Sequence, residues 1–93
     1  IPEGKVMMYD NNFCLNHKKK GKVEKVAVLS SSKSGRVMEV YNDHPGLQVY
    51  SGARKAIALE SQMYPDSPNH AEFPSVVLSP GEVYRHTCIY RFK

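Results

Sequence analysis

Tryptophan is absent from this chain, and only two of its 93 residues are cysteine. No apolar run approaches the roughly 18 residues that a membrane-spanning helix needs, so we expect no membrane segment in these residues. Neither a Cys-x-x-Cys nor a His-x-x-x-His spacing occurs, and local ligand spacing therefore gives no support for a metal site.

The two cysteines, Cys14 and Cys88, permit one disulfide but do not imply it. Apolar or aromatic residues flank both, which suits small buried thiols that behave as hydrophobic side chains. The chain has no Asn-x-Ser/Thr sequon, so nothing favours secretion. We expect a reducing, cytoplasmic environment.

The formal net charge is +4, and the basic excess is concentrated in one short segment. Three consecutive lysines, Lys18 to Lys20, precede Gly21, a pattern typical of a solvated hairpin tip. A nucleic-acid interface would instead interleave basic and aromatic residues along one face. We therefore predict no nucleic-acid partner.

The order of apolar segments and turn residues predicts an all-β chain. A length of 93 residues allows at most one domain with a limited core. Alternating side chains separated by Gly, Pro, Asn, Asp and Ser predict strands over 23–29, 36–41, 47–51, 56–62 and 82–92. No window shows a sustained helical period. Many short strands with turns between them favour an antiparallel sandwich.

One carboxylate, Glu60, stands late in an apolar strand-like run that starts at Ala56. A carboxylate at such a position often acts as the base of a pocket, because burial beside apolar neighbours raises the pKa of a carboxyl group toward neutrality. The alternation of a strand puts Ala58, Glu60 and Gln62 on one face. A solvated edge residue is the alternative interpretation.

Several linked motifs carry a more specific signal than Glu60 alone. They are Ala-Leu-Glu-Ser-Gln at 58–62, Pro-Asp-Ser-Pro-Asn-His at 65–70, Phe-Pro-Ser at 73–75, Leu-Ser-Pro-Gly-Glu-Val-Tyr at 78–84 and, upstream, Tyr-Asp-Asn-Asn-Phe-Cys-Leu at 9–15, Ser-Gly-Arg-Val-Met-Glu-Val-Tyr at 34–41 and Pro-Gly-Leu-Gln-Val-Tyr-Ser-Gly at 45–52. Together they closely resemble the C-terminal end of the aldose 1-epimerases, or galactose mutarotases. The resemblance covers nearly the whole chain in the family's order.

This resemblance implies a large two-sheet β-sandwich, of which residues 1–93 would be the C-terminal part of a single mutarotase-like domain. Family members are much longer than this chain. A fragment, a processed chain, an incomplete one and one half of a split enzyme all remain open.

The resemblance also implies a reaction: interconversion of the α and β anomers of a glucose- or galactose-type hexose. A base removes the proton of the anomeric hydroxyl while an acid, usually a His, protonates the ring oxygen, and no metal or organic cofactor is needed. Matching the motifs assigns the base to Glu60 and substrate binding to Asp10 and Gln48. The acid matches none of the four histidines here, so it is expected on the remaining segment or a partner chain, and this chain alone is expected to be an incomplete enzyme.

Each assignment has an alternative. Asp10 would otherwise be an Asx-turn residue leading into Phe13, and Gln48 a sheet-surface glutamine facing away from Leu47 and Val49.

The chain also departs from the family pattern in two places. Asn11 stands where the family usually has His, and the connection at 53–56 is much shorter than the family's. The second interpretation of the whole chain is a non-catalytic, mutarotase-like carbohydrate-binding or scaffold protein.

Overall fold

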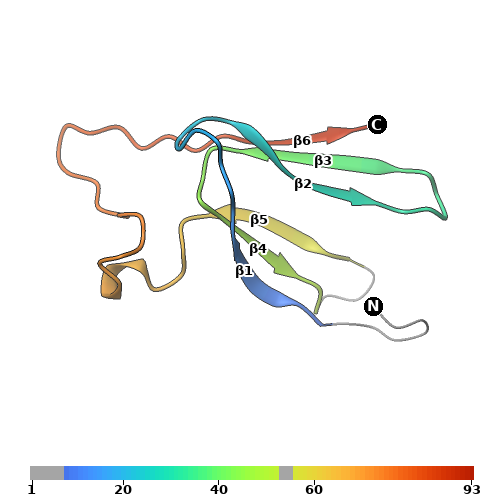
Figure 1. Ribbon diagram of the computed structural model, residues 1–93, viewed down its shortest axis with the longest axis horizontal. Helices are drawn as coiled ribbons and strands as arrows, with labels where there is room; N and C mark the ends of the chain where they lie inside the picture. The colour runs from blue at the N-terminus through green and yellow to red at the C-terminus, as the bar shows by residue number, and fades with distance from the viewer. Residues whose placement is uncertain (1–7, 53–55) are drawn as a thin grey trace.

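Two three-stranded antiparallel sheets make up the computed structural model, which describes residues 8–52 and 56–93 (Figure 1). One sheet has the order β1-β4-β5, with bounds Asp10–Cys14, Gly46–Tyr50 and Ala58–Gln62. The other has the order β2-β3-β6, with bounds Glu24–Ser30, Val37–Asn42 and Cys88–Phe92. A 3-10 helix, η1 (Ser67–Asn69), lies in the connection from β5 to β6. The expected all-β class is confirmed.

The predicted strands at 23–29, 36–41 and 47–51 occur within one residue of their expected ends, as β2, β3 and β4. The predicted strand over 82–92 is wrong for its first half, because only Cys88–Phe92 is extended and paired. The partner of β6 is β3, which pairs with it from Met38 to Asn42. Beyond Asn42 the chain leaves that sheet for β4, so residues 82–87 have no strand beside them.

Two further differences follow from pairing in the other sheet. The strand expected over 56–62 begins at Ala58, since its partner β4 ends at Tyr50, the residue opposite Ala58. The segment at 10–14, which was not predicted as a strand, becomes β1 by pairing with β4. The short connection at 53–56 falls mostly on residues 53–55, which lie outside the described residues.

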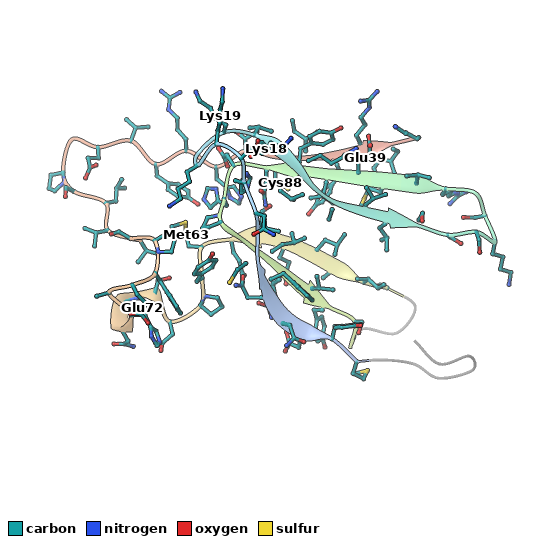
Figure 2. All side chains as sticks on the ribbon, viewed as in Figure 1. Lys18, Lys19, Glu39, Met63, Glu72 and Cys88 are labelled. Carbon is teal, nitrogen blue, oxygen red and sulfur yellow. The ribbon has the colours of Figure 1, made fainter. Side chains whose placement is uncertain are left out.

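The lysines at 18–20 lie on an exposed turn, as expected, but this turn is not a hairpin tip. It leads from β1 in one sheet to β2 in the other, and Figure 2 shows Lys18 and Lys19 at this crossing. Gly21 adopts a φ of 74°, a left-handed conformation that glycine takes without strain. The turn therefore connects the two layers.

The apolar core between the sheets is small. Val40 of β3 and Leu47 of β4 are the buried hydrophobic residues among those described, with exposures of 0% and 3%. A cavity of about 640 Å³ lies beside Leu47, between β1, β2 and β4. Val77, Val83 and Phe92 are each more than 70% exposed. The described residues thus leave much apolar surface uncovered.

Both cysteines are free thiols, but the expectation that they would be buried is wrong. Cys14 is exposed and Cys88 is half-buried. Because side chains alternate along β1, Cys14 lies on the same face of the sheet as the polar side chains of Asp10 and Asn12.

A buried polar network links the two sheets near the ends of β2 and β3. The Asn42 side chain is fully buried, and its Nδ2 donates to Ser61 Oγ of the opposite sheet at 2.5 Å. His17 Nε2 lies 3.1 Å from Asn42 Oδ1 and 2.8 Å from the His44 carbonyl oxygen. His17 Nδ1 lies 2.9 Å from Glu24 Oε1. Both polar atoms of the Asn42 side chain therefore have partners outside β3, one in the connection from β1 to β2 and one in β5.

Glu39 lies on the opposite face of β3, where it is buried beneath two lysine side chains. Its Oε2 is 3.3 Å from Lys25 Nζ and 3.5 Å from Lys93 Nζ, and the Tyr41 hydroxyl donates to Oε1. Burial alone raises the pKa of the Glu39 carboxyl. The hydrogen bonds and charges of Lys25 and Lys93 outweigh that effect and hold this pKa below its ordinary value of 4.5.

We predict that Asn42→Ala lowers the free energy of unfolding by about 1–3 kcal/mol, because it leaves buried polar partners unsatisfied. Urea unfolding of the full-length protein measures this change. Asn16→Ala, at an exposed asparagine, is the control and should change stability by less than about 0.5 kcal/mol. Equal effects of the two substitutions would contradict a structural role for the network.

We predict that acid weakens the fold in part through Glu39. A carboxyl whose pKa is lower in the folded state stabilises the protein above its unfolded pKa and loses this contribution as the pH falls through its folded pKa. Glu39→Gln should therefore lower stability at neutral pH and flatten the loss of stability below pH 4.5. Unfolding midpoints across this pH range test it, with the exposed Glu72→Gln as the control. Parallel pH profiles of wild type and Glu39→Gln would show that Glu39 does not contribute.

Candidate functional site

The three residues singled out in the sequence lie on one face of the β1-β4-β5 sheet. Asn12, Gln48 and Glu60 form a row across the three strands, since Gln48 is the pairing partner of both others. Asp10 lies one step along β1, opposite Tyr50, on the same face. Directly paired residues of antiparallel strands project to the same side, so tertiary structure brings together side chains 50 positions apart in the chain.

Hydrogen bonds join the amide side chains of this face into a chain. Gln48 Nε2 donates to Asp10 Oδ1 at 2.8 Å. Gln62 Nε2 lies 2.9 Å from Gln48 Oε1 and 3.0 Å from Asn12 Oδ1, both of which accept. These contacts orient Gln48 toward Asp10. The expectation that Gln48 faces away from Leu47 and Val49 is confirmed.

Asn12 was not identified from the sequence as part of the site. Its signal is its spacing, two residues after Asp10, which places both on one face once the segment is known to be a strand. Asp10 is the first residue of β1 and is paired with Tyr50, so the Asx-turn interpretation of Asp10 is wrong.

Gly46 allows this arrangement because its position has no room for a side chain. A Cβ atom there would overlap Asn12 Oδ1 and would approach the Gln62 carbonyl oxygen to 3.0 Å. Any larger residue would displace Asn12 from its place between β4 and Gln62. The glycine is therefore required for close packing of polar side chains on this face.

Glu60 lies at the centre of β5, and its surroundings match the alternative interpretation of a solvated edge residue rather than burial beside apolar neighbours. Its side chain is exposed, because β5 is an edge strand with no neighbour on its far side among the described residues. A hollow of about 340 Å³ lies beside it, lined in part by Ala58, Leu59 and Tyr90. The Tyr90 hydroxyl donates to the Leu59 carbonyl oxygen at 2.6 Å.

The carboxylate of Glu60 has an electrostatic effect on this hollow. Burial raises the pKa of the Tyr90 hydroxyl, and the nearby Cys88 and Glu60 raise it further. Tyr90 therefore stays a neutral hydrogen-bond donor beside Glu60 near neutral pH.

The histidines lie away from this face. His70 lies in the connection after η1, stacked on Phe73 with ring centroids 4.5 Å apart. His86 lies before β6, where its ring stacks against that of His44, and the centroid of the Tyr84 ring lies 6.4 Å away. Among the described residues the polar face thus has carboxylates and amides but no imidazole. Such a set can accept and donate hydrogen bonds to a ligand with several hydroxyl groups.

Comparison with known families places this arrangement in context. The aldose 1-epimerase family matches residues 2–91. The chain belongs to this family. It is 36% identical over 100 residues to galactose mutarotase of Mus musculus and 38% identical over 102 residues to that of Homo sapiens, in each case across 90% of this chain. It is 37% identical over 105 residues to aldose 1-epimerase of Escherichia coli K12, across 95% of this chain.

The chain spans 29–30% of the length of these curated relatives. In the part of the chain that the structure describes, no helix is long and apolar enough to cross a membrane.

Proposed function

We propose that this chain supplies the base and part of the sugar-binding surface of an aldose 1-epimerase that interconverts the α and β anomers of a glucose- or galactose-type hexose. The observation that carries the proposal is the shared face of Asp10, Gln48 and Glu60, with Gln48 hydrogen-bonded to Asp10. Membership of the family supports the reaction class.

Glu60 acts as the base in this proposal. Its carboxylate takes the proton from the anomeric hydroxyl while an acid donates a proton to the ring oxygen. The bond between the anomeric carbon and the ring oxygen breaks and leaves an open-chain aldehyde. Rotation about the adjacent carbon–carbon bond and closure with the proton transfers reversed give the other anomer. The position of Glu60, exposed and directly opposite Gln48, suits a base that must reach a ligand lying on the sheet.

Asp10 and Gln48 hold the sugar in place. A carboxylate accepts hydrogen bonds from neighbouring hydroxyls, and an amide can both accept and donate. Because Gln48 already donates to Asp10, both side chains are oriented before the ligand arrives. Fixing the ring in this way places the anomeric hydroxyl against Glu60 and reduces the entropy lost on reaching the transition state.

The acid comes from outside this set of residues. We infer that a histidine of the remaining segment, or of a partner chain, lies across the face from Glu60, and that residues 1–93 form the C-terminal part of one mutarotase-like domain. The exposed edge strands and apolar side chains fit a chain that is covered by further strands. The free thiols of Cys14 and Cys88 fit a reducing, cytoplasmic environment.

The alternative is a mutarotase-like protein that binds a carbohydrate without converting it. The exposure of Glu60 favours this alternative only if no other segment covers the face. Polarimetry of the full-length protein with α-glucose and α-galactose separates the two. Sugar binding without faster equilibration would establish the non-catalytic role.

We predict that Glu60→Gln lowers kcat about 10²–10⁴-fold, because the amide keeps the shape but cannot accept the proton. The KM for the sugar should stay within a few-fold, since Gln48 and Asp10 remain. Polarimetric rates of the full-length protein measure both constants. The control is Glu82→Gln, which changes an exposed glutamate outside the strands. A Glu60→Gln variant with unchanged kcat would show that another group is the base.

We predict that Asp10→Asn and Gln48→Ala mainly raise KM. Loss of a charged hydrogen bond costs about 1.5–3 kcal/mol and loss of a neutral one about 0.5–1.5 kcal/mol, so the Asp10 change should be the larger. Steady-state polarimetry over a range of sugar concentrations compares them. If kcat fell with Asp10→Asn while KM did not change, Asp10 would act in the chemical step and not in binding.

A further inference from the structure

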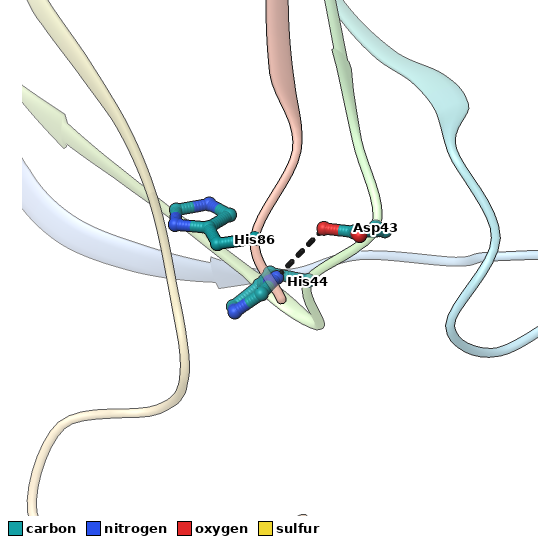
Figure 3. A group of neighbouring side chains, drawn as sticks. All are labelled: Asp43, His44 and His86. Carbon is teal, nitrogen blue, oxygen red and sulfur yellow. Dashed lines mark hydrogen bonds and ion pairs between the residues drawn. The ribbon is translucent and has the colours of Figure 1, made fainter. Parts of the chain in front are cut away.

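A group of potential metal ligands lies away from the polar face, where β3 turns into β4. Asp43 and His44 belong to this turn, and His86 comes from the segment that precedes β6 (Figure 3). One ligand atom from each of the three residues lies within 4.8 Å of the others. Two of these ligands are imidazoles and the third is a carboxylate.

His44 is held in one orientation. Its ring is buried, with Nδ1 2.8 Å from Asp43 Oδ1 and Nε2 3.1 Å from the Tyr84 hydroxyl. When Nε2 carries the proton and donates it to Tyr84, the lone pair of Nδ1 points at the Asp43 carboxylate. In the other tautomer Nδ1 carries the proton and donates it to Asp43 Oδ1, so a metal ion that binds Nδ1 takes the place of a proton there. Two ligand atoms on a tetrahedral zinc ion, each about 2.0–2.1 Å from it, lie about 3.3–3.4 Å apart, so the 2.8 Å between Nδ1 and Oδ1 lengthens by about 0.5 Å when the ion binds.

The Asp43 carboxylate is also fixed. Oδ1 accepts a hydrogen bond from the Thr87 backbone N–H at 3.0 Å, and the side chain is 14% exposed. A hydrogen bond to a ligating carboxylate from the surrounding shell orients it toward the ion. This contact also brings the segment that carries His86 against the turn.

His86 supplies the third ligand. Its ring lies against that of His44, with centroids 3.8 Å apart and planes at 36°. Ligand atoms on a tetrahedral zinc ion lie about 3.3–3.4 Å apart, so ligand atoms spread over as much as 4.8 Å must move closer together, and the His86 ring must turn out of its stack on His44. The His86 side chain is exposed, and rotation about its side-chain bonds can supply this movement without disturbing the core.

We propose that Asp43, His44 and His86 bind a divalent first-row transition-metal ion of the zinc type. Imidazole and carboxylate together suit Zn²⁺, Co²⁺ or Ni²⁺, whereas Mg²⁺ and Ca²⁺ take oxygen ligands. The ion joins the turn that connects the two sheets to the segment leading into β6. It has a structural role in this proposal and takes no part in the proton transfers assigned to Glu60.

The test uses the full-length protein without an affinity tag, stripped with a chelator and titrated with Zn²⁺ by calorimetry. We expect one saturable site per chain that is weakened at least about tenfold by His86→Gln and by Asp43→Asn, since even the loss of an outer-shell partner costs about 10–100-fold. The matched control is His70→Gln, which removes another imidazole bonded to carboxylates, those of Asp66 and Glu72, and should leave the site intact.

Thermal unfolding distinguishes zinc bound at this site from zinc bound elsewhere on the protein. Zn²⁺ should raise the Tm of wild type and His70→Gln, and this rise should be lost in His86→Gln. X-ray absorption of the zinc-loaded wild type should show two imidazole ligands. Zn²⁺ affinity and a Tm rise that are the same in wild type and His86→Gln, or no saturable binding at all, would overturn the proposal.

Discussion

The register of β4 between β1 and β5 is the constraint on which the candidate site depends. Gln48 is paired with Asn12 on one side and Glu60 on the other, and this places three polar side chains in one row. Because side chains alternate along a strand, a slip of one residue would turn Gln48 toward the apolar side and bring Leu47 out. Burial of Leu47 against the other sheet opposes that slip. The core and the site are therefore held by the same register.

The turn from β3 to β4 connects the two sheets and carries polar contacts to both. Asn42 bonds to Ser61 across the sandwich, and the His44 carbonyl oxygen accepts from His17. Asp43 accepts a hydrogen bond from the backbone N–H of Thr87, the residue just before the last strand. A core as small as this one gains little from apolar burial, so buried polar contacts at one turn contribute a large share of the order between the layers.

Much of the fold was predictable because short strands separated by turn residues have a strong local signal. β2, β3 and β4 occur almost where the alternation places them. The failures concern pairing. β1 has the polar sequence Asp-Asn-Asn-Phe-Cys and becomes a strand only beside β4, whereas residues 82–87 alternate well but have no partner. Local pattern cannot report whether a neighbouring strand is present, since strands are stabilised mainly by contacts between distant segments.

The sequence by itself determined the all-β class, the likeness to aldose 1-epimerases and the identity of Asp10, Gln48 and Glu60 as candidates, because these depend on residue type and order. Tertiary structure alone decided that Asn12 and Gln62 join them, that Glu60 lies mid-strand and exposed, and that His86 meets the Asp43–His44 turn. The reason is physical: an antiparallel sandwich brings together side chains that are tens of residues apart, and no local spacing records which of them will face one another.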